Sequence, residues 1–581
     1  MNLAMPELGV SHGGTRGCTK NLVVRVLASR WFMVFASILI MSVNGTLYMF
    51  GLYSNDIKTS MGYDQSTLNL IGFFKDLGGN LGISAGLIYE VVPPWAILSI
   101  GAVMNFSSYF LIWLSVTGRI AKPRVWQMCL YTCTGANSLS FSNTAALVTS
   151  VKNFPHNRGI VIGLLKGFIG LSGAIITQLY HALYGDDSTA LILLIAYLPA
   201  IVSLAFLPTV RIIKFVARKE DVKVFSDFLY ISLGLAGFLM AIIVLQSKLQ
   251  FSRLEYIGTA VIVLVLSLCV PLCIVIYEEI KLAKLRKAID NPSRCELPPA
   301  ALEPQSGWSR ALTCPNPISC VADILKPLER GEDYSILQAI FSIDMLIIFI
   351  ATTCGVGGIL AAIDNLGQIG ESMGYPAHSM AAFVSLISIW NYLGRVAAGF
   401  SSEILLAKYK FPRPLMLSIV ILCSCAGHVL VACAVPGSLY PSSMIMGFCL
   451  GAQVPLVSSI ISEIFGLKHY ATLYNVGTLS SPVGSYIFNV KVAGLLYDQE
   501  AAKQMEALGL KRKAGEALRC RGVQCYRTAF AVLAASTMFG CLVSLALVIR
   551  TWKFYKGDVY KKFTEETTAA EDVHDEKTDE K

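Results

Sequence analysis

The sequence predicts an all-α polytopic membrane protein, and two observations carry that prediction. Hydrophobic residues make up 54% of the 581 residues and charged residues only 15%, against about 25% charged residues in soluble proteins. Apolar runs of roughly 20 residues, the length that crosses a ~30 Å hydrocarbon core as a helix, recur along the chain. These runs are longer than the strands of a membrane barrel, and a helix satisfies its own backbone polar groups in lipid. We therefore expect helical spans.

The apolar segments form two groups of six that are separated by a pair. The first six lie near residues 31–53, 66–89, 94–117, 125–149, 158–181 and 188–209. The pair lies near 226–246 and 254–277, and the second six lie near 334–361, 377–403, 414–434, 438–464, 469–496 and 525–550. The chain therefore crosses the membrane 12 to 14 times, depending on whether the central pair crosses.

The segments outside these spans complete the domain organisation. The parts are an N-terminal tail over 1–30, a first half over 31–210, an extra helix pair over 226–277, a polar loop over 278–333, a second half over 334–550 and an acidic tail over 551–581. Lys and Arg residues favour the cytosolic side, so the basic residues of the N-terminal tail place that tail in the cytosol. Both termini and the polar loop are then cytosolic. The stretches "TGRIAKPR" and "EALGLKRKAGEALRCRG" are also basic, although they fall in loops expected to be external.

The chain ends bear on the location of the protein. The basic N-terminal residues lead into a full-length span without a small-residue cleavage site, which is unlike a secretory signal peptide. The tail "TEETTAAEDVHDEKTDEK" is charged and carries no organelle address. We expect an integral multi-pass protein of the plasma membrane or of a vacuolar or other endomembrane.

Most of the 16 cysteines lie inside the predicted spans, where cysteine acts as a small buried hydrophobe. Cys520 and Cys525 lie in the last external loop, "CRGVQCY", and an oxidising compartment would join them in a disulfide. The alternative is two free thiols. Cys295, Cys314 and Cys320 share the 278–333 loop without a nearby histidine, so we expect neither a metal site nor a cofactor.

Two short patterns recur in the two halves. "SAGLIYE" (84–90) is echoed by "AAGFSSE" (397–403), and "KNFPHNR" (152–158) is echoed by "SEIFGLKH" (462–469). Parallel repeats of this kind are typical of major facilitator transporters. Charged residues at these junctions are candidates for a cytosolic gate: Glu90, Arg158, Arg395, Glu403, Arg413 and Glu463, with inter-half salt bridges at Arg158, Glu463 and Lys468.

Longer motifs narrow the resemblance. They are "GFFKDLGGNLG", "NFPHNRGIVIGLLKGFIGLSGAI", "AAIDNLGQIGESMGY", "SEIFGLKHYATLYN" and "CRGVQCYRTAF". Together they resemble the plant nodulin-like family of the major facilitator superfamily, from about residue 30 to 550. The resemblance implies the major facilitator fold, two six-helix bundles with two extra central helices here, and does not supply an agreed substrate.

Two lysines lie inside predicted spans beside glycine ladders. Lys75 shares a helix face with Gly79, Gly82 and Gly86, and Lys166 lies within a glycine stripe of the fifth span. Glycine stripes pack helices closely, but an ionisable residue in a span persists mainly where it faces a polar interior and finds a partner. We expect Lys75 and Lys166 to line the solute pathway, with Asp76 beside them holding their charge state. The alternative is a buried pair in which Asp76 neutralises Lys166.

The second half offers possible counterparts. Asp344 lies roughly 11 residues into the predicted span 334–361, near its middle, with Asn365 on a similar face. It is a candidate for binding and releasing a proton, or for a structural pair with a lysine. His428 is alone on an apolar helix, where packing with one hydrogen bond is favoured over a proton relay. Lys491 lies near the external side and snorkels.

Other classes of function have little support in the sequence. There is no phosphate-binding loop, zinc-protease motif or nucleophile elbow, so an enzyme is not expected. The net charge of +9 is spread over the cytosolic loops, so nucleic acid is not an expected partner either. We expect a monomeric transporter in the lipid bilayer that moves a small solute, favouring a small organic anion with proton coupling. The alternative is a transporter-shaped solute sensor without flux.

Overall fold

The computed structural model describes residues 23–559, except 64, 186, 214–220, 250, 290–327, 376, 436, 508–519 and 558. The predicted loop cysteines Cys295, Cys314 and Cys320, and most of both tails, lie outside the described residues. Among the described residues, eight helices are long and apolar enough to cross a membrane, and no strand occurs. The predicted all-α membrane fold is confirmed. Two shorter apolar helices, Arg30–Ser42 and Thr189–Ala205, add to these eight.

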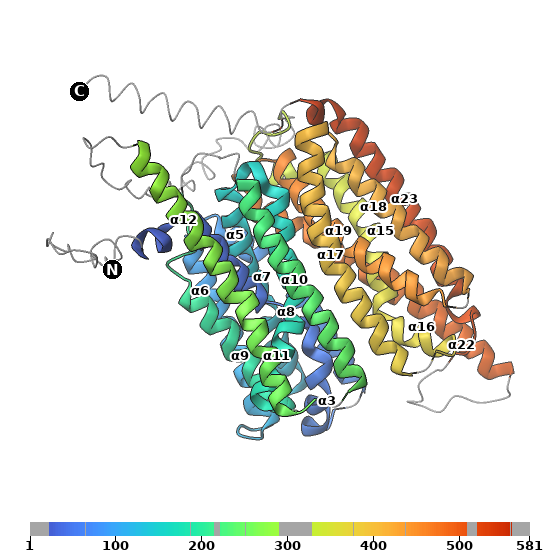
Figure 1. Cartoon of the computed structure of the whole chain (residues 1–581). Helices are drawn as coiled ribbons and strands as arrows, with labels where there is room; N and C mark the ends of the chain where they lie inside the picture. The colour runs from blue at the N-terminus through green and yellow to red at the C-terminus, as the bar shows by residue number, and fades with distance from the viewer. Residues whose placement is uncertain are drawn as a thin grey trace, which may run out of the picture.

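The first half forms one bundle and the second half another (Figure 1). The first contains α2 (Arg30–Ser42), η1 (Thr46–Met49), α3 (Phe50–Met61), α4 (Gln65–Asn80), α5 (Ile83–Tyr89), α6 (Pro94–Val116), α7 (Val125–Asn153), η2 (Pro155–Asn157), α8 (Arg158–Tyr184) and α9 (Ser188–Ala205). The second contains α14 (Ile336–Ile340), α15 (Ile343–Asp364), α16 (Leu366–Ser372), α17 (Ala377–Tyr409), α18 (Arg413–Cys433), α19 (Leu439–Ile464), α20 (Tyr470–Thr478), α21 (Ser480–Ser485), η5 (Tyr486–Gly494), α22 (Leu495–Ala507) and α23 (Gln524–Lys556). We call the end of the bundle where α2 begins and α23 ends the terminal end, and the opposite end the distal end.

The inserted pair between the halves comprises α10 (Asp221–Lys248) and a second long helix made of α11 (Arg253–Leu264), η3 (Val265–Cys269) and α12 (Val270–Ile289). Both helices are long and apolar enough to cross a membrane. At the terminal end, α10 is joined to α2 by the Arg30–Asp221 ion pair. In Figure 1 the pair lies alongside the first half and α10 extends toward the second.

Several observed helix boundaries differ from the predicted ones. The predicted spans 31–53 and 66–89 are each divided, at Ser42 and at Asn80. The second inserted helix continues to Ile289, and the last helix continues to Lys556. The first helix of the second half begins only at Ile343, because the Ser342 hydroxyl accepts the Met345 backbone N–H (3.1 Å) and caps it there. The short α14 takes up the residues before this cap. The shift of this start by nine residues relative to the predicted 334 matters for Asp344 below.

Glycines of the 71–90 stretch let helices meet at backbone distance. A Cβ on Gly78 would collide with the Cys133 carbonyl of α7, and a Cβ on Gly86 would lie 2.7 Å from the Thr472 Cα of α20. Gly163 of α8 meets Gly399 of α17 in the same way, with 2.8 Å from a Cβ to the Gly399 Cα. Close approach of this kind is the usual role of small residues in membrane helices. Two seams between the halves, α5–α20 and α8–α17, are thus formed partly by glycine.

The Cys520–Cys525 pair is joined in a disulfide at the start of α23, with 2.04 Å between the sulfur atoms. The Cys520 backbone N–H donates to the Tyr497 hydroxyl (3.1 Å) and the Gly522 N–H to the Ser372 carbonyl (2.9 Å). The small ring therefore connects α22, α16 and α23 at the distal end.

This disulfide gives a direct chemical prediction. Trypsin cleaves after Arg519, Arg521 and Arg527, so Cys520 and Cys525 leave in different peptides. Without reductant the two peptides should stay joined, and with reductant they should separate, as measured by mass spectrometry of the digest. The Cys520→Ser variant is the control and should yield only separate peptides. Separate, alkylated peptides from the unreduced wild type would show that both thiols are free.

Candidate functional site

Lys166 of α8 lies between the two halves. Its side chain is only 6% exposed, and it lies eight residues from the start of α8, about 12 Å along the helix axis. The ammonium donates to the Tyr474 hydroxyl of α20 and to Asn143 Oδ1 of α7 (3.2 Å), and lies 5.0 Å from the centre of the Tyr474 ring. A first-half cation is thus bound by a second-half aromatic residue and a neutral amide.

Arg395 of α17 lies at the same level. Its Nη1 donates to the backbone carbonyl of Lys166 (2.7 Å), and the residue is 7% exposed. Among the described residues, neither Lys166 nor Arg395 has an acidic partner within ion-pair distance, and Arg395 Nε has no hydrogen-bond partner. We predicted Arg395 as a gate residue. It lies instead eight residues before Glu403, about 12 Å deeper into the bundle.

The predicted alternative in which Asp76 neutralises Lys166 is wrong. Asp76 is mostly exposed, and its carboxylate pairs with the neighbouring Lys75 (3.0 Å). The Lys75 ammonium also lies 5.1 Å from the centre of the Phe50 ring. In the described part of the chain, the hydrogen-bond partners of Lys166 are Tyr474 and Asn143 and do not include Asp76. Lys166 keeps only neutral partners.

An acidic residue that we did not predict lies across from Lys75. Asp364, the last residue of α15, interacts electrostatically with Lys75 and Asp76. Its carboxylate accepts from Asn489 Nδ2 (3.0 Å) and Asn489 Oδ1 accepts from Asn365 (2.7 Å). Asn365 therefore belongs to a second polar group between the halves, nearer the distal end than Lys166.

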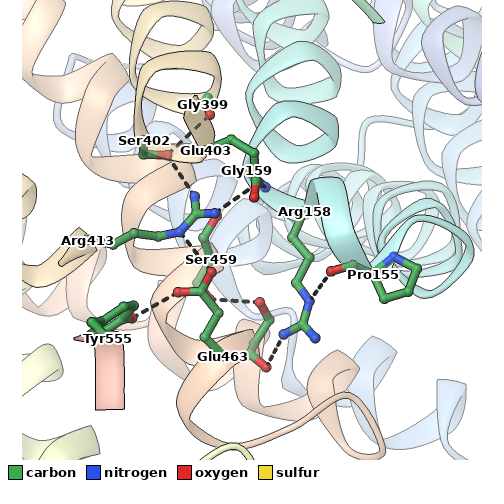
Figure 2. A network of polar contacts seen from close by, with 11 residues as sticks. Pro155, Arg158, Gly159, Gly399, Ser402, Glu403, Arg413, Ser459, Glu463 and Tyr555 are labelled. Atoms are coloured by element: carbon green, nitrogen blue, oxygen red, sulfur yellow. Dashed lines mark hydrogen bonds and ion pairs between the residues drawn. The ribbon is translucent and has the colours of Figure 1, made fainter. Parts of the chain in front are cut away.

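At the terminal end, Arg413 lies inside the second half between two carboxylates (Figure 2). Its guanidinium pairs with Glu403 Oε2 (2.8 Å) and with Glu463 Oε1 (2.8 Å), and also donates to Ser402 Oγ (2.7 Å). The Tyr555 hydroxyl donates to the other Glu463 oxygen (2.9 Å). The Arg413 and Glu463 side chains are fully buried. These ion pairs join α17, α18 and α19, all helices of one half.

The halves are connected at this end through backbone groups. The Gly159 N–H at the start of α8 donates to Glu403 Oε2 (2.7 Å), a favourable place for a carboxylate because helix N-termini carry partial positive charge. Arg158 Nη1 donates to the Ser462 carbonyl (2.7 Å), and its Nε donates to the Pro155 carbonyl (2.8 Å). We predicted an inter-half salt bridge at Arg158, and Arg158 interacts electrostatically with Glu463 of the second half in addition to its bond to the Ser462 carbonyl.

The second seam has its own link at the terminal end. Glu90, at the end of α5, faces His469 before α20, with 3.3 Å between Oε2 and Nδ1. Next to this seam, Asn475 Nδ2 of α20 donates to Thr144 Oγ1 of α7 (3.0 Å). Lys468, predicted as a gate cation, uses its backbone N–H to reach Asp333 Oδ1 (3.1 Å). Both seams are therefore held by polar bonds near the terminal end.

We predicted that Asp344 lies near the middle of its span, and this prediction is wrong. It is in the first turn of α15, where its carboxylate pairs with Arg330 (2.7 Å) and with Arg550 of α23 (2.6 Å). Asn365 follows the last residue of the same helix as its C-cap, about 30 Å away along the helix axis. The prediction failed because the helix starts at residue 343 rather than 334. At the terminal end, Asp344 therefore connects the start of α15 to Arg330 in the preceding segment and to Arg550 near the end of α23.

The placement of Asp344 makes a testable prediction about proton coupling. Asp344→Asn removes two partly exposed ion pairs, so the free energy of unfolding should fall by about 1–2 kcal/mol. Any proton-driven solute uptake should persist in vesicles, since the carboxylate lies far from the lysine site. Arg550→Gln, which removes one of the same pairs, should cause a smaller change of the same kind. Loss of proton-driven uptake in folded Asp344→Asn protein, with uptake normal in Arg550→Gln, would restore Asp344 as the coupling acid.

Several residues of the site were missed from the sequence. Tyr474 stands inside the recognised stretch "SEIFGLKHYATLYN", but nothing in its spacing ties it to Lys166. Asn143 is one of several polar residues in a span without strong amphipathicity. Asp364 stands inside the recognised stretch "AAIDNLGQIGESMGY", but it lies past the end of the predicted span 334–361, where a carboxylate carries no special signal.

Comparison with known proteins places these features in a family context. A model described as Nodulin-like matches residues 30–276, and a model described as NFD4, C-terminal domain, matches residues 332–557. Protein NUCLEAR FUSION DEFECTIVE 4 of Arabidopsis thaliana is 24% identical over 544 residues, covering 90% of this chain and 89% of that protein. Probable transporter MCH1 of Yarrowia lipolytica is 23% identical over 233 residues, covering 38% of this chain and 46% of that protein.

Among solved structures, the major facilitator proton:xylose symporter XylE is similar in fold. The TM-score is 0.50 at 12% sequence identity, and the match covers 91% of this chain and 96% of that chain. A structure of a double Trp mutant of XylE gives the same TM-score at 13% identity, with 90% and 95% covered. At such low identity the similarity concerns the arrangement of helices alone.

Proposed function

Because the chain belongs to the nodulin-like family of the major facilitator superfamily, we propose that it moves a small organic anion across a membrane by alternating access. The observation that carries the proposal is the pair of buried cations, Lys166 and Arg395, which lie between the halves without an acidic partner among the described residues. A carboxylate-bearing solute would supply the missing negative charge.

The energetics favour an anion over a neutral solute. Keeping an unpaired charge inside a span costs on the order of 3 kcal/mol or more. Charge-assisted hydrogen bonds to a carboxylate recover part of this cost, and they are roughly twice as strong as neutral ones. The Arg395 Nε, which lacks a hydrogen-bond partner, supplies a donor. The Tyr474 hydroxyl and Asn143 amide hold the Lys166 ammonium in place.

Alternating access requires the two halves to separate at one end at a time. At the terminal end, separation would break the Gly159–Glu403 bond, the Arg158–Ser462 bond and the Glu90–His469 contact. The α8–α17 seam, where Gly163 lies against Gly399, offers a surface on which the halves turn without interlocked side chains. We place the terminal end in the cytosol, because Lys and Arg residues collect around it.

Relatives support transport over a purely sensory role. The yeast relative MCH1 is named a probable transporter. A solute sensor with the same fold would also need a buried cation to bind an anion. The Lys166–Arg395 pair alone therefore does not distinguish a transporter from a sensor. Movement of solute across a membrane does.

The test is solute flux with the full-length protein reconstituted in lipid vesicles. Radiolabelled monocarboxylates are expected to accumulate, and unlabelled monocarboxylates should compete while neutral sugars should not. An inward proton gradient should increase the initial uptake rate if a proton travels with the anion. Thermal-shift measurements on the same protein report binding independently, because a ligand of the native state raises the melting temperature. Binding of carboxylates without flux would identify a sensor, and flux of neutral solutes alone would overturn the anion assignment.

A further inference from the structure

Helix α15 carries a glycine notch on the face that meets α18, α19 and α23. Gly355 and Gly358 of α15 lie one turn apart on this face. A Cβ on Gly355 would press against Gln453 Oε1 of α19, and a Cβ on Gly358 would lie 3.2 Å from both His428 Nε2 of α18 and Thr537 Oγ1 of α23. Three different helices therefore direct a polar side chain at the notch.

The polar atoms around the notch have no protein partner. His428, Gln453 and Thr537 are all 0% exposed. Within the described part of the chain, both ring nitrogens of His428, both amide atoms of Gln453 and the Thr537 hydroxyl lack hydrogen bonds. The sequence predicted that His428 would make one hydrogen bond, and the structure offers no protein group for it. An unpaired buried polar group costs about 1–3 kcal/mol, so such groups in native proteins nearly always have a partner.

The chemistry of the notch selects a neutral ligand that both donates and accepts hydrogen bonds. Apart from the His428 imidazole, the atoms nearest to Gly355 and Gly358 come from side chains that are neither acidic nor basic, and no cluster of metal-binding side chains occurs in the described residues. His428 Nε2 and Thr537 Oγ1 are each 3.2 Å from the same point, so they lie within twice that distance of each other. They are not hydrogen-bonded to each other, and one water molecule spans such a gap. Buried waters typically bind two to four polar groups.

We propose that the Gly355–Gly358 notch is an internal water-binding site, in which ordered waters bond His428, Thr537 and Gln453 between α15, α18, α19 and α23. The site lies within the second half and is separate from the proposed anion site between the halves. Its hydrogen bonds are to exchangeable waters rather than to fixed side chains. It does not depend on the identity of the transported solute.

Radiolytic hydroxyl-radical labelling of the full-length protein in lipid nanodiscs tests the site, because radicals form from bound water and oxidise adjacent side chains. Phe530 is the reporter: it is 0% exposed and its ring centre is 5.9 Å from that of His428. Phe225 is the matched control, also 0% exposed but packed against Trp31 and Phe154. Phe530 should be oxidised severalfold faster than Phe225 if water lies beside it, because buried waters bond to the polar groups next to the Phe530 ring.

Two variants locate the water. The double variant His428→Leu/Thr537→Val replaces two of the three polar groups of the site, including the one beside Phe530, by apolar ones of similar size. It should lower Phe530 oxidation to the rate of Phe225. Thr551→Val is the control, since Thr551 is equally buried on α23 but bonds its own helix at the Leu547 carbonyl (2.7 Å), and it should leave the rate unchanged. Equal oxidation of Phe530 and Phe225 in the wild type would overturn the proposal, as would fast Phe530 oxidation that persists in the double variant.

Discussion

Lys166→Met is expected to abolish most transport while the protein stays folded. Methionine keeps much of the length of lysine and removes the charge. Losing a hydrogen bond between an ammonium and a solute carboxylate costs about 1.5–3 kcal/mol, which corresponds to a roughly 10- to 150-fold loss of kcat/KM. Stability should not fall, because the partners of Lys166 are Tyr474 and Asn143, both neutral. Initial uptake rates in vesicles and the melting temperature of the purified protein are the two measurements.

The control for this experiment is Lys491→Met. Lys491 lies in η5 beside Tyr486, 5.7 Å from its ring centre, and has no contact with the lysine site. Transport by this variant should be close to that of the wild type. Normal uptake by a well-folded Lys166→Met protein would exclude Lys166 as a solute ligand. A variant that unfolds instead would point to a structural charge pair that the structure does not contain.

Arg413→Met is expected to give the largest loss of stability. It leaves Glu403 and Glu463 together in a buried site without their shared cation, and removing one partner from a buried ion pair costs about 3–5 kcal/mol. The free energy of unfolding should fall by about that amount, measured by thermal or denaturant unfolding in detergent. Transport should fall as the folded fraction falls.

Two further variants separate the charge from other effects of the substitution. Arg413→Met/Glu463→Gln removes one of the stranded carboxylates and should recover part of the lost stability. Arg527→Met, at an exposed arginine of α23, should change stability by less than about 0.5 kcal/mol. If Arg413→Met were as stable as Arg527→Met, the Arg413 ion pairs would not stabilise the second half.

The fold could be predicted from the sequence because membrane helices follow from apolar length and glycine spacing. The nodulin-like resemblance was recognised from five longer motifs and the two-half arrangement from two repeated junction patterns, and both are confirmed. Gly86 and Gly163 could be predicted as positions of close helix packing, because glycine lets the backbones of two helices come into contact. The disulfide between Cys520 and Cys525 could be predicted because both cysteines lie in the same short loop.

The candidate site was less predictable, because it depends on helix rotation and on where each helix starts. A nine-residue shift in the start of α15 moved Asp344 from the middle of a span to its end. Lys75 and Asp76 are neighbours in sequence, and only the helix direction decides which of them faces inward. Tyr474 reaches Lys166 across 308 positions of sequence, a contact that no local pattern encodes.

The inserted helices also determine how membrane lipid meets the two halves. α10 bonds both sides of the α8–α17 seam: Gln246 exchanges amide hydrogen bonds with Gln178 of α8 (3.1 and 3.0 Å), and Ser232 accepts from the Tyr392 hydroxyl of α17 (2.7 Å). The outward residues of α10, such as Tyr230 and Val244, are exposed. Acyl chains on this flank therefore touch α10 instead of the seam. A membrane-dissolved solute entering sideways from the bilayer would have to use the opposite flank, along α5 and α20.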